Sequence, residues 1–148
     1  MGHEPKWLTL SSVRYLVSAG IGTVIAIQQN LRADFGGFLA AGGGTVIHDF
    51  VTMNGTALSA PLIFLVLQGI FTVLIWRPGR VGLVSVAGLT LLGGIYTLAQ
   101  LGEPIVLRIL NPASFDLAQA VVLAADLMLS AAMLIFGIRE WRGRRATH

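Results

Sequence analysis

Four long apolar segments set the strongest limit on how this chain can fold. They run at about residues 7–28, 58–76, 81–101 and 117–138. Each is close to the roughly 20 residues that an α-helix needs to cross a bilayer. Only 11% of the 148 residues are charged and the mean hydropathy is +0.78, so a soluble protein of this size lacks the interior to bury that apolar surface. We therefore expect an all-α, polytopic membrane protein with one domain, a bundle of four transmembrane helices.

The first segment differs from the others because Arg14 lies inside it. Arg14 is about two turns from Trp7, so its long side chain can reach the lipid head groups. A cleaved signal peptide needs a short apolar core followed by a small-residue cleavage site. The sequence QQNLRADF, which follows the segment, offers no clear site of that kind. We expect the segment to be a helix of the mature protein.

The positions of lysine and arginine predict the orientation in the membrane. Of the ten cations, two lie before or early in the first segment, two in the turn RPGR, and four in the C-terminal tail. Only Arg32 and Arg108 lie in the other two connections. The positive-inside rule then places both termini in the cytoplasm, with Trp7, Trp76 and Trp141 as interfacial anchors on that side. We expect a multi-pass protein of a bacterial plasma (inner) membrane.

The net charge and the cysteine and histidine content limit which molecules the protein can bind. We interpret the net charge of +3 as a result of the lysines and arginines that orient the chain in the membrane. The C-terminal tail REWRGRR is better suited to contact anionic lipid head groups than nucleic acid. The chain has no cysteine, and its three histidines show no metal-ligand spacing. We therefore expect the lipid bilayer as the main partner, no metal, no cofactor and no nucleic acid. A lipophilic small molecule, a second copy of the chain and a larger membrane complex are further candidate partners.

Two connections are predicted to lie outside the cell. The first, a glycine-rich loop over residues 29–57, contains an apolar piece at 35–47 that is too short to span. This piece is re-entrant, lies at the interface or caps the bundle as a lid. The second connection has the sequence GEPIVLRILNPASFD, and Pro104 and Pro112 bracket a short amphipathic helix in it. Asp116 is placed to cap the last helix.

One carboxylate, Asp126, lies near the middle of the fourth segment. It is about 13 Å beyond Leu117 along a helix, which is close to mid-bilayer. Helical spacing puts Gln119 and Ser130 on the same face, and Gln68 lies at a similar depth. We expect Asp126 to face inward, to stay protonated at pH 7, and to bond Gln68 or Ser130. It is either a hydrogen-bonded contact between helices or a proton-carrying or catalytic acid.

A second polar group is predicted at the outer mouth. Tyr96, Gln100 and Glu103 follow one another at helical spacing and form one stripe on the third segment. Acid, base and hydroxyl groups in one pocket are of the types that general acid–base catalysis uses. Residues from the two outer connections are expected to converge on this stripe: His48, Asp49 and Arg108. The predicted Glu103–Arg108 contact also fits a plain surface ion pair.

The helix count and the sequence LRADFGGF at 31–38 resemble small four-span bacterial membrane proteins of the DoxX-like kind. No functional residue is carried over from this resemblance. Small multidrug exporters also have four spans, but they rely on a carboxylate in the first span, where this chain has Arg14.

Three functions are compatible with the sequence. The leading one is a non-catalytic membrane component that binds a lipid or apolar ligand or joins a larger complex. The second is a membrane-embedded acid/base enzyme for a lipophilic substrate, with a pocket that contains either Asp126 or Tyr96 with Glu103. The third is a proton-coupled small transporter that uses Asp126.

Overall fold

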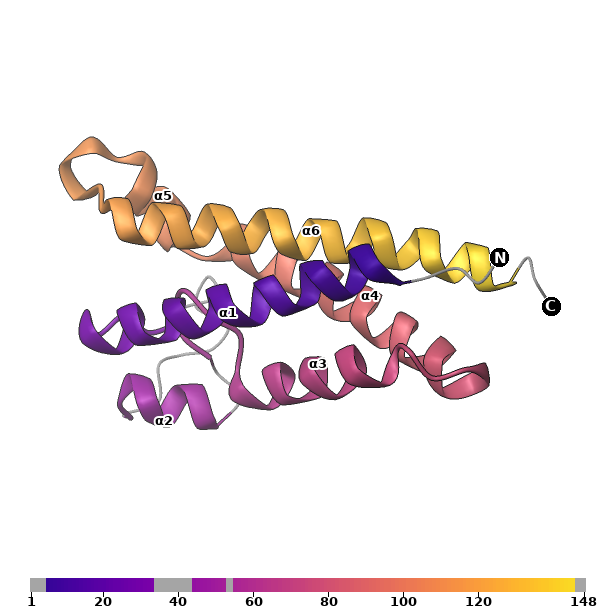
Figure 1. Ribbon diagram of the computed structural model, residues 1–148. Coiled ribbons are helices and arrows are strands. Elements are labelled where there is room, and N and C mark those ends of the chain that lie inside the picture. Colours follow the sequence, from indigo (N-terminus) through magenta and orange to yellow (C-terminus); the bar gives the residue numbers. More distant parts are fainter. Residues whose placement is uncertain (1–4, 34–43, 53–54, 146–148) are drawn as a thin grey trace.

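The fold is described from a computed structural model, which defines residues 5–33, 44–52 and 55–145. Within these residues every regular element is a helix, and extended pairing is limited to isolated bridges (Figure 1). In chain order the elements are α1 (Lys6–Gln28), α2 (Val46–Val51), α3 (Leu62–Leu74), α4 (Gly79–Gly102), α5 (Ile105–Leu110), the 3₁₀ helix η1 (Pro112–Ser114) and α6 (Leu117–Arg145). The predicted all-α class is confirmed.

Three of these helices, α1, α4 and α6, are long and apolar enough to cross a membrane. They correspond to the first, third and fourth predicted segments. The other apolar helix, α3, has 13 residues and begins at Leu62, so the predicted start at residue 58 is wrong. The chain before α3 makes a tight turn instead, in which the Thr56 N–H donates to the Ser59 carbonyl at 2.9 Å. Pro61 leads from this turn into the helix with extended ψ.

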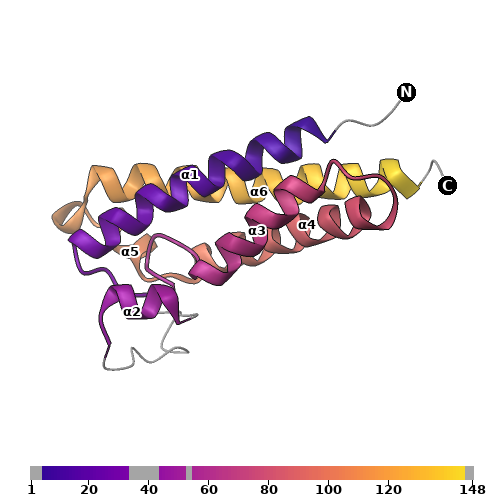
Figure 2. The same cartoon turned by 60° about the horizontal axis from the view of Figure 1, so that its bottom comes forward.

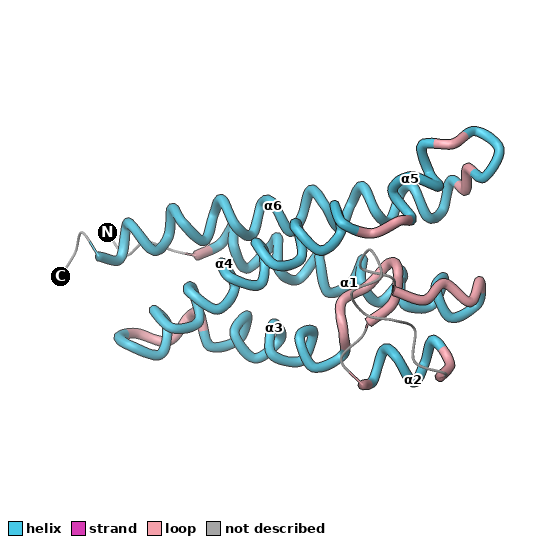
Figure 3. The backbone as a smooth tube through the Cα atoms, turned by 180° about the vertical axis from the view of Figure 1, so that it is seen from behind, coloured by secondary structure: helices cyan, strands magenta, loops and turns pink. Residues whose placement is uncertain are grey.

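The four long elements α1, α3, α4 and α6 lie side by side and alternate in direction (Figures 1 and 2). Helix α6 packs along α4 and α1, and α3 packs against the same two helices. Seen from behind, α4 crosses between α6 and α3 (Figure 3). The start of α1, the end of α6 and the α3–α4 turn lie at one end of the bundle, here named the terminal end. Helices α2 and α5 lie at the opposite end, here named the loop end.

Glycine allows the closest helix crossing, between α4 and α6. A side chain at Gly93 would collide with the α6 backbone at Ser130 and Leu134, and one at Gly137 would collide with Thr90 of α4. Small residues let two backbones approach in this way where lipid offers no hydrophobic driving force between helices. Helices α4 and α6 therefore approach closely at Gly93, whereas a Cβ added at Gly94 would meet only the Leu134 side chain.

Hydrogen bonds between buried polar side chains join the helices midway along the bundle. The Ser12 and Thr72 hydroxyls lie 2.6 Å apart between α1 and α3. Gln68 is fully buried, and its amide donates to the carbonyl and hydroxyl oxygens of Ser12 at 3.1 and 3.0 Å. Thr97 of α4 and Ser130 of α6 share a hydrogen bond of 3.0 Å. Each bond satisfies groups whose burial alone would be costly.

The helix α6 continues past the predicted limit of residue 138 to Arg145. Its last turns are held by Arg144, which donates to the Glu140 carboxylate at 2.7 Å and to the Ile75 carbonyl at 3.0 Å. The Ile75 carbonyl follows the end of α3, so this arginine joins α6 to α3 at the terminal end. The Arg145 guanidinium lies over the Trp141 ring, 4.7 Å from its centroid.

The structure describes only part of the first predicted outer connection and all of the second. Most of the apolar piece at 35–47 lies outside the described residues, and its last two residues, Val46 and Ile47, begin α2. The short helix predicted between Pro104 and Pro112 is present as α5. Helix α2 of the first connection and helix α5 of the second both lie at the loop end (Figure 1).

Candidate functional site

A pocket of about 170 Å³ opens between the helices near the loop end. It is formed by α1, α3 and α4 and by the turn over residues 56–61 that precedes α3. Its walls combine aromatic and small apolar side chains with a few polar groups, a mixture typical of small-molecule sites. The lining residues are Tyr15, Thr56, Ala57, Ser59, Ala60, Pro61, Phe64, Ile95, Tyr96, Ala99, Gln100 and Glu103.

Two stacked tyrosines form the inner wall of this pocket. The Tyr15 ring from α1 and the Tyr96 ring from α4 lie nearly parallel, at 6°, with centroids 4.7 Å apart. Both residues are at most 2% exposed. Aromatic pairs at this separation are stabilising beyond the area they bury. The stack therefore fixes the position of both hydroxyls relative to the pocket.

Tyr96, Gln100 and Glu103, the residues of the predicted stripe, all line the pocket. The Gln100 amide nitrogen donates to the Tyr15 hydroxyl at 3.2 Å. The Gln100 carbonyl oxygen and the Tyr96 hydroxyl are buried and have no hydrogen-bond partner among the described residues. Glu103 is the C-cap of α4 and is 5% exposed. The pocket thus presents hydrogen-bonding atoms beside apolar walls.

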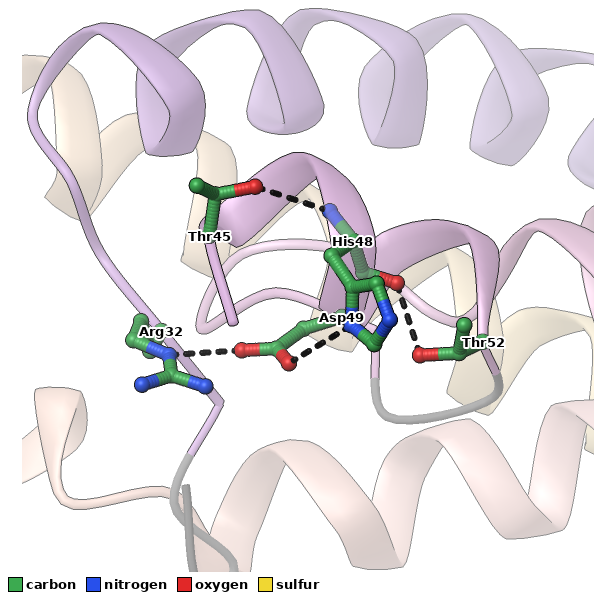
Figure 4. A network of polar contacts seen from close by, with 5 residues as sticks. All are labelled: Arg32, Thr45, His48, Asp49 and Thr52. Atoms are coloured by element: carbon green, nitrogen blue, oxygen red, sulfur yellow. Dashed lines mark hydrogen bonds and ion pairs between the residues drawn. The ribbon is translucent and has the colours of Figure 1, made fainter. Parts of the chain in front are cut away.

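An ion pair in the first connection holds the turn that covers the pocket (Figure 4). Arg32 donates to the Asp49 carboxylate at 2.6 Å, and Asp49 is almost completely buried. This hydrogen bond raises the pKa of the Arg32 guanidinium. The backbone around Arg32 pairs with Thr56, and the Gly55 N–H donates to the Asp49 carbonyl at 3.0 Å. The ion pair thereby joins α2 to the pocket wall at Thr56.

The predicted convergence of the outer connections on the stripe is wrong. His48, Asp49 and Arg108 are absent from the pocket lining. The His48 imidazole is 64% exposed and lies 3.9 Å from the Asp49 carboxylate, and its backbone groups bond Thr45 and Thr52 within and beside α2 (Figure 4). Arg108 makes no ion pair with Glu103, because Glu103 turns into the bundle. Asp49 does not reach the stripe because α2 places its carboxylate against Arg32.

Asp126 is turned toward protein, as predicted, and is 1% exposed. It lies on the face of α6 that packs against α1, where Ser18 faces its carboxyl group in a geometry short of a hydrogen bond. Tyr15 lies close enough to interact with it electrostatically. The predicted bond to Gln68 or Ser130 is wrong, because neither carboxyl oxygen has a partner among the described residues. Gln68 bonds Ser12, and Ser130 bonds Thr97.

Gln119 lies at the loop end and does not join Asp126. Its side-chain amide donates to Gln29 of α1 at 2.5 Å, and its backbone N–H donates to the Asp116 carboxylate at 3.1 Å. Gln29 in turn donates to Asp116 at 3.2 Å. The bond from the Gln119 N–H lowers the pKa of the Asp116 carboxyl group. The predicted capping role of Asp116 is confirmed, and Gln119 joins the ends of α1 and α6.

Most residues that line the pocket were not among the sequence candidates, and Tyr15, Ser59 and Phe64 are three examples. Tyr15 carried a usable signal, since a tyrosine in an apolar segment brings a hydroxyl that needs a partner when buried. Ser59 carried none, because its segment was predicted to be helical. Phe64 is one apolar residue among many in α3.

No protein-family model, curated protein or solved structure matches the chain. The resemblance to DoxX-like proteins therefore supports no argument about the site. Any function has to be argued from the geometry of the pocket itself. Among the described residues, no cluster of three or more candidate metal-ligating side chains occurs.

Proposed function

We propose that this protein is a non-catalytic membrane component that binds a small lipophilic molecule in the pocket between Tyr15, Tyr96 and the turn at 56–61. The observation that carries the proposal is the pocket itself. Its volume of about 170 Å³ is close to the roughly 150 Å³ of an apolar cavity that holds one benzene ring. The proposed ligand is therefore a molecule that carries one aromatic ring or an apolar group of similar size.

We propose a plasma-membrane topology in which α1, α3, α4 and α6 all span, with both termini in the cytoplasm. The alternating directions of the helices and the cations at the terminal end support it. A helix of 13 residues is only about 20 Å long, shorter than the roughly 30 Å hydrocarbon core. The turn before α3 supplies the missing depth: Ala57, Leu58 and Ser59 are buried in protein, where non-helical backbone is tolerated in membranes. In this orientation the pocket lies toward the outer side.

A binding experiment with the purified protein in detergent micelles tests the proposed ligand site. The probes are p-cresol and toluene, which share one ring and differ by a hydroxyl. We expect both to bind, and p-cresol to bind about fivefold more tightly, because its hydroxyl can bond Gln100 or Tyr96. Ligand-observed NMR titrations give the two dissociation constants.

Matched variants separate the pocket from partition into the micelle. The change Ala99→Phe fills the pocket from α4, whereas Val84→Phe puts a ring on the exposed face of the same helix, outside the pocket and the other described hollows. We expect Ala99→Phe to abolish saturable binding of both probes and Val84→Phe to preserve it. Equal binding by native protein and Ala99→Phe would refute the proposed function.

The enzyme hypothesis has one favourable observation, because the Glu103 carboxyl group and the Tyr96 hydroxyl line the same pocket. If the pocket carries out acid–base chemistry, Glu103→Gln should stop turnover of a bound substrate while preserving binding. The transporter hypothesis depends on Asp126, which lies outside the pocket lining. Its test is proton-coupled flux into liposomes, which Asp126→Asn should abolish.

A further inference from the structure

A shallow groove of about 500 Å³ runs between α4 and α6 on the face away from α1 and α3. Its walls are almost entirely apolar, with Leu91, Gly94 and Leu98 on α4 and Leu134 and Ile138 on α6. Leu91 and Leu98 are mostly exposed, so in the proposed topology they face lipid. The groove follows α4 from Ala87 to Leu98, about 16 Å at 1.5 Å per residue. That is about half of a 30 Å hydrocarbon core, the depth of one leaflet.

The groove ends toward the terminal end at Trp141 and Arg142. Arg142 also lines a second hollow, between the start of α1 and α6, together with Trp7, Phe136 and Arg139. Arg142 therefore stands where the two hollows meet, and Arg139 lies one turn before it on the same helix. Among the described residues neither arginine has a carboxylate within ion-pair distance. Glu140, the acidic residue of the second hollow, is bonded by Arg144.

We infer that this face binds one anionic phospholipid, with an acyl chain in the α4–α6 groove and its phosphate at Arg142 and Arg139. Charge complementarity and groove depth select this occupant. Two exposed guanidinium groups next to an aromatic interface residue suit a phosphate, which arginine binds through paired N–H donors. The apolar groove beneath them suits a chain that enters one leaflet. This site shares one lining residue, Ile95, with the pocket near the loop end, but its phosphate position at Arg142 lies outside that pocket and does not depend on the ligand proposed there.

Native mass spectrometry of the detergent-solubilised protein tests the inference. The probes are phosphatidylglycerol and phosphatidylcholine with identical chains, and glycerol phosphate as a head group without chains. We expect phosphatidylglycerol to bind at least fivefold more tightly than phosphatidylcholine, since each arginine near a lipid head contributes about that factor. We expect no binding of glycerol phosphate. Equal affinity for the two lipids would overturn the inference.

Two pairs of variants locate the site. Arg142→Gln should remove most of the preference for phosphatidylglycerol, whereas Arg80→Gln, at the same end but outside the groove, should preserve it. Gly94→Leu should weaken both lipids, because a Cβ there meets only Leu134 at 3.7 Å and the rest of the side chain enters the groove. Gly69→Leu on α3, also in open space, is its control. Native affinity in Arg142→Gln would refute the assigned phosphate position.

Discussion

At the scale of single residues, the lack of a hydrogen-bond partner for the buried Asp126 carboxyl group among the described residues is the feature that the sequence least led us to expect. A buried carboxyl group whose two oxygens lack hydrogen-bond partners among the described residues is costly, because it has lost water without replacing it. By contrast, Ser130, one turn away on α6, bonds both Thr97 and the Leu127 carbonyl. The two residues therefore make opposite contributions to stability, although the sequence places them on one face.

This contrast gives a prediction for the free energy of unfolding in micelles. Asp126→Leu, which keeps the branching and number of side-chain heavy atoms but removes both polar oxygens, should raise it by about 1–3 kcal/mol, the cost of an unsatisfied buried group. Ser130→Ala should lower it by about 1 kcal/mol, because it breaks a formed hydrogen bond. Steric-trapping measurements on both variants check the signs. Destabilisation by Asp126→Leu would mean that the carboxyl group has a structural partner.

At the scale of elements, the polar contacts at helix ends decide where helices begin and how they are joined. The start of α6 is fixed by Asp116, which accepts the Gln119 N–H and the Gln29 side-chain amide. The start of α3 is displaced to Leu62 because the residues before Pro61 form a turn that pairs with the chain at Arg32. The apolar composition of residues 58–76 indicated neither the later start of α3 nor the pairing between Arg32 and Thr56.

The cap at Asp116 predicts a pH dependence. Its pKa in the folded protein is lowered, chiefly by the Gln119 N–H, below the ordinary value of about 3.9. Its stabilisation is therefore complete above that value and is lost as the pH falls through the folded pKa. Asp116→Asn keeps a good cap but cannot titrate. Melting curves between pH 2 and 5 should show a shallower acid loss in the variant, and an unchanged slope would contradict the role assigned to Asp116.

Much of the fold could be predicted from the sequence, because apolar segments and prolines act locally. The first, third and fourth segments, the short helix between Pro104 and Pro112, the Asp116 cap and the inward face of Asp126 all follow from spacing. The site was predicted in part. The stripe of Tyr96, Gln100 and Glu103 lies on one helix, so its spacing was sufficient. The stacking of Tyr15 on Tyr96 and the Arg32–Asp49 pair join distant segments, and no local pattern encodes them.

At the scale of the whole molecule, the two ends of the bundle differ in the elements and side chains that they carry. Helices α2 and α5 lie at the loop end, whereas the start of α1 and the end of α6 lie at the terminal end (Figure 1). Arg142, Arg144 and Arg145 belong to the last turn of α6. The proposed ligand pocket lies toward the loop end, and the proposed phosphate position at Arg142 lies toward the terminal end. In the proposed topology α3 crosses the membrane together with the three longer helices.

Substituted cysteines test that crossing, and the chain is suited to them because it contains no cysteine. Arg80→Cys and Arg145→Cys at the terminal end should react with a membrane-impermeant maleimide only after the cells are opened. Thr52→Cys, in the connection between α1 and α3 at the loop end, should react in intact cells. All three native residues are exposed, so accessibility is governed by the side of the membrane. Labelling of residues 52 and 80 from the same side would show that α3 does not cross and would contradict the four-span topology.

An experimental structure with bound 4-bromophenol shows whether the space beside Tyr15 and Tyr96 is a ligand site. Anomalous scattering locates the bromine without assumptions about the surrounding density. We expect one strong peak inside the pocket, within contact of the two rings and Ala99, with the phenol oxygen toward Gln100. A pocket filled by its own side chains, with bromine found only among lipid and detergent, would contradict the proposed ligand site.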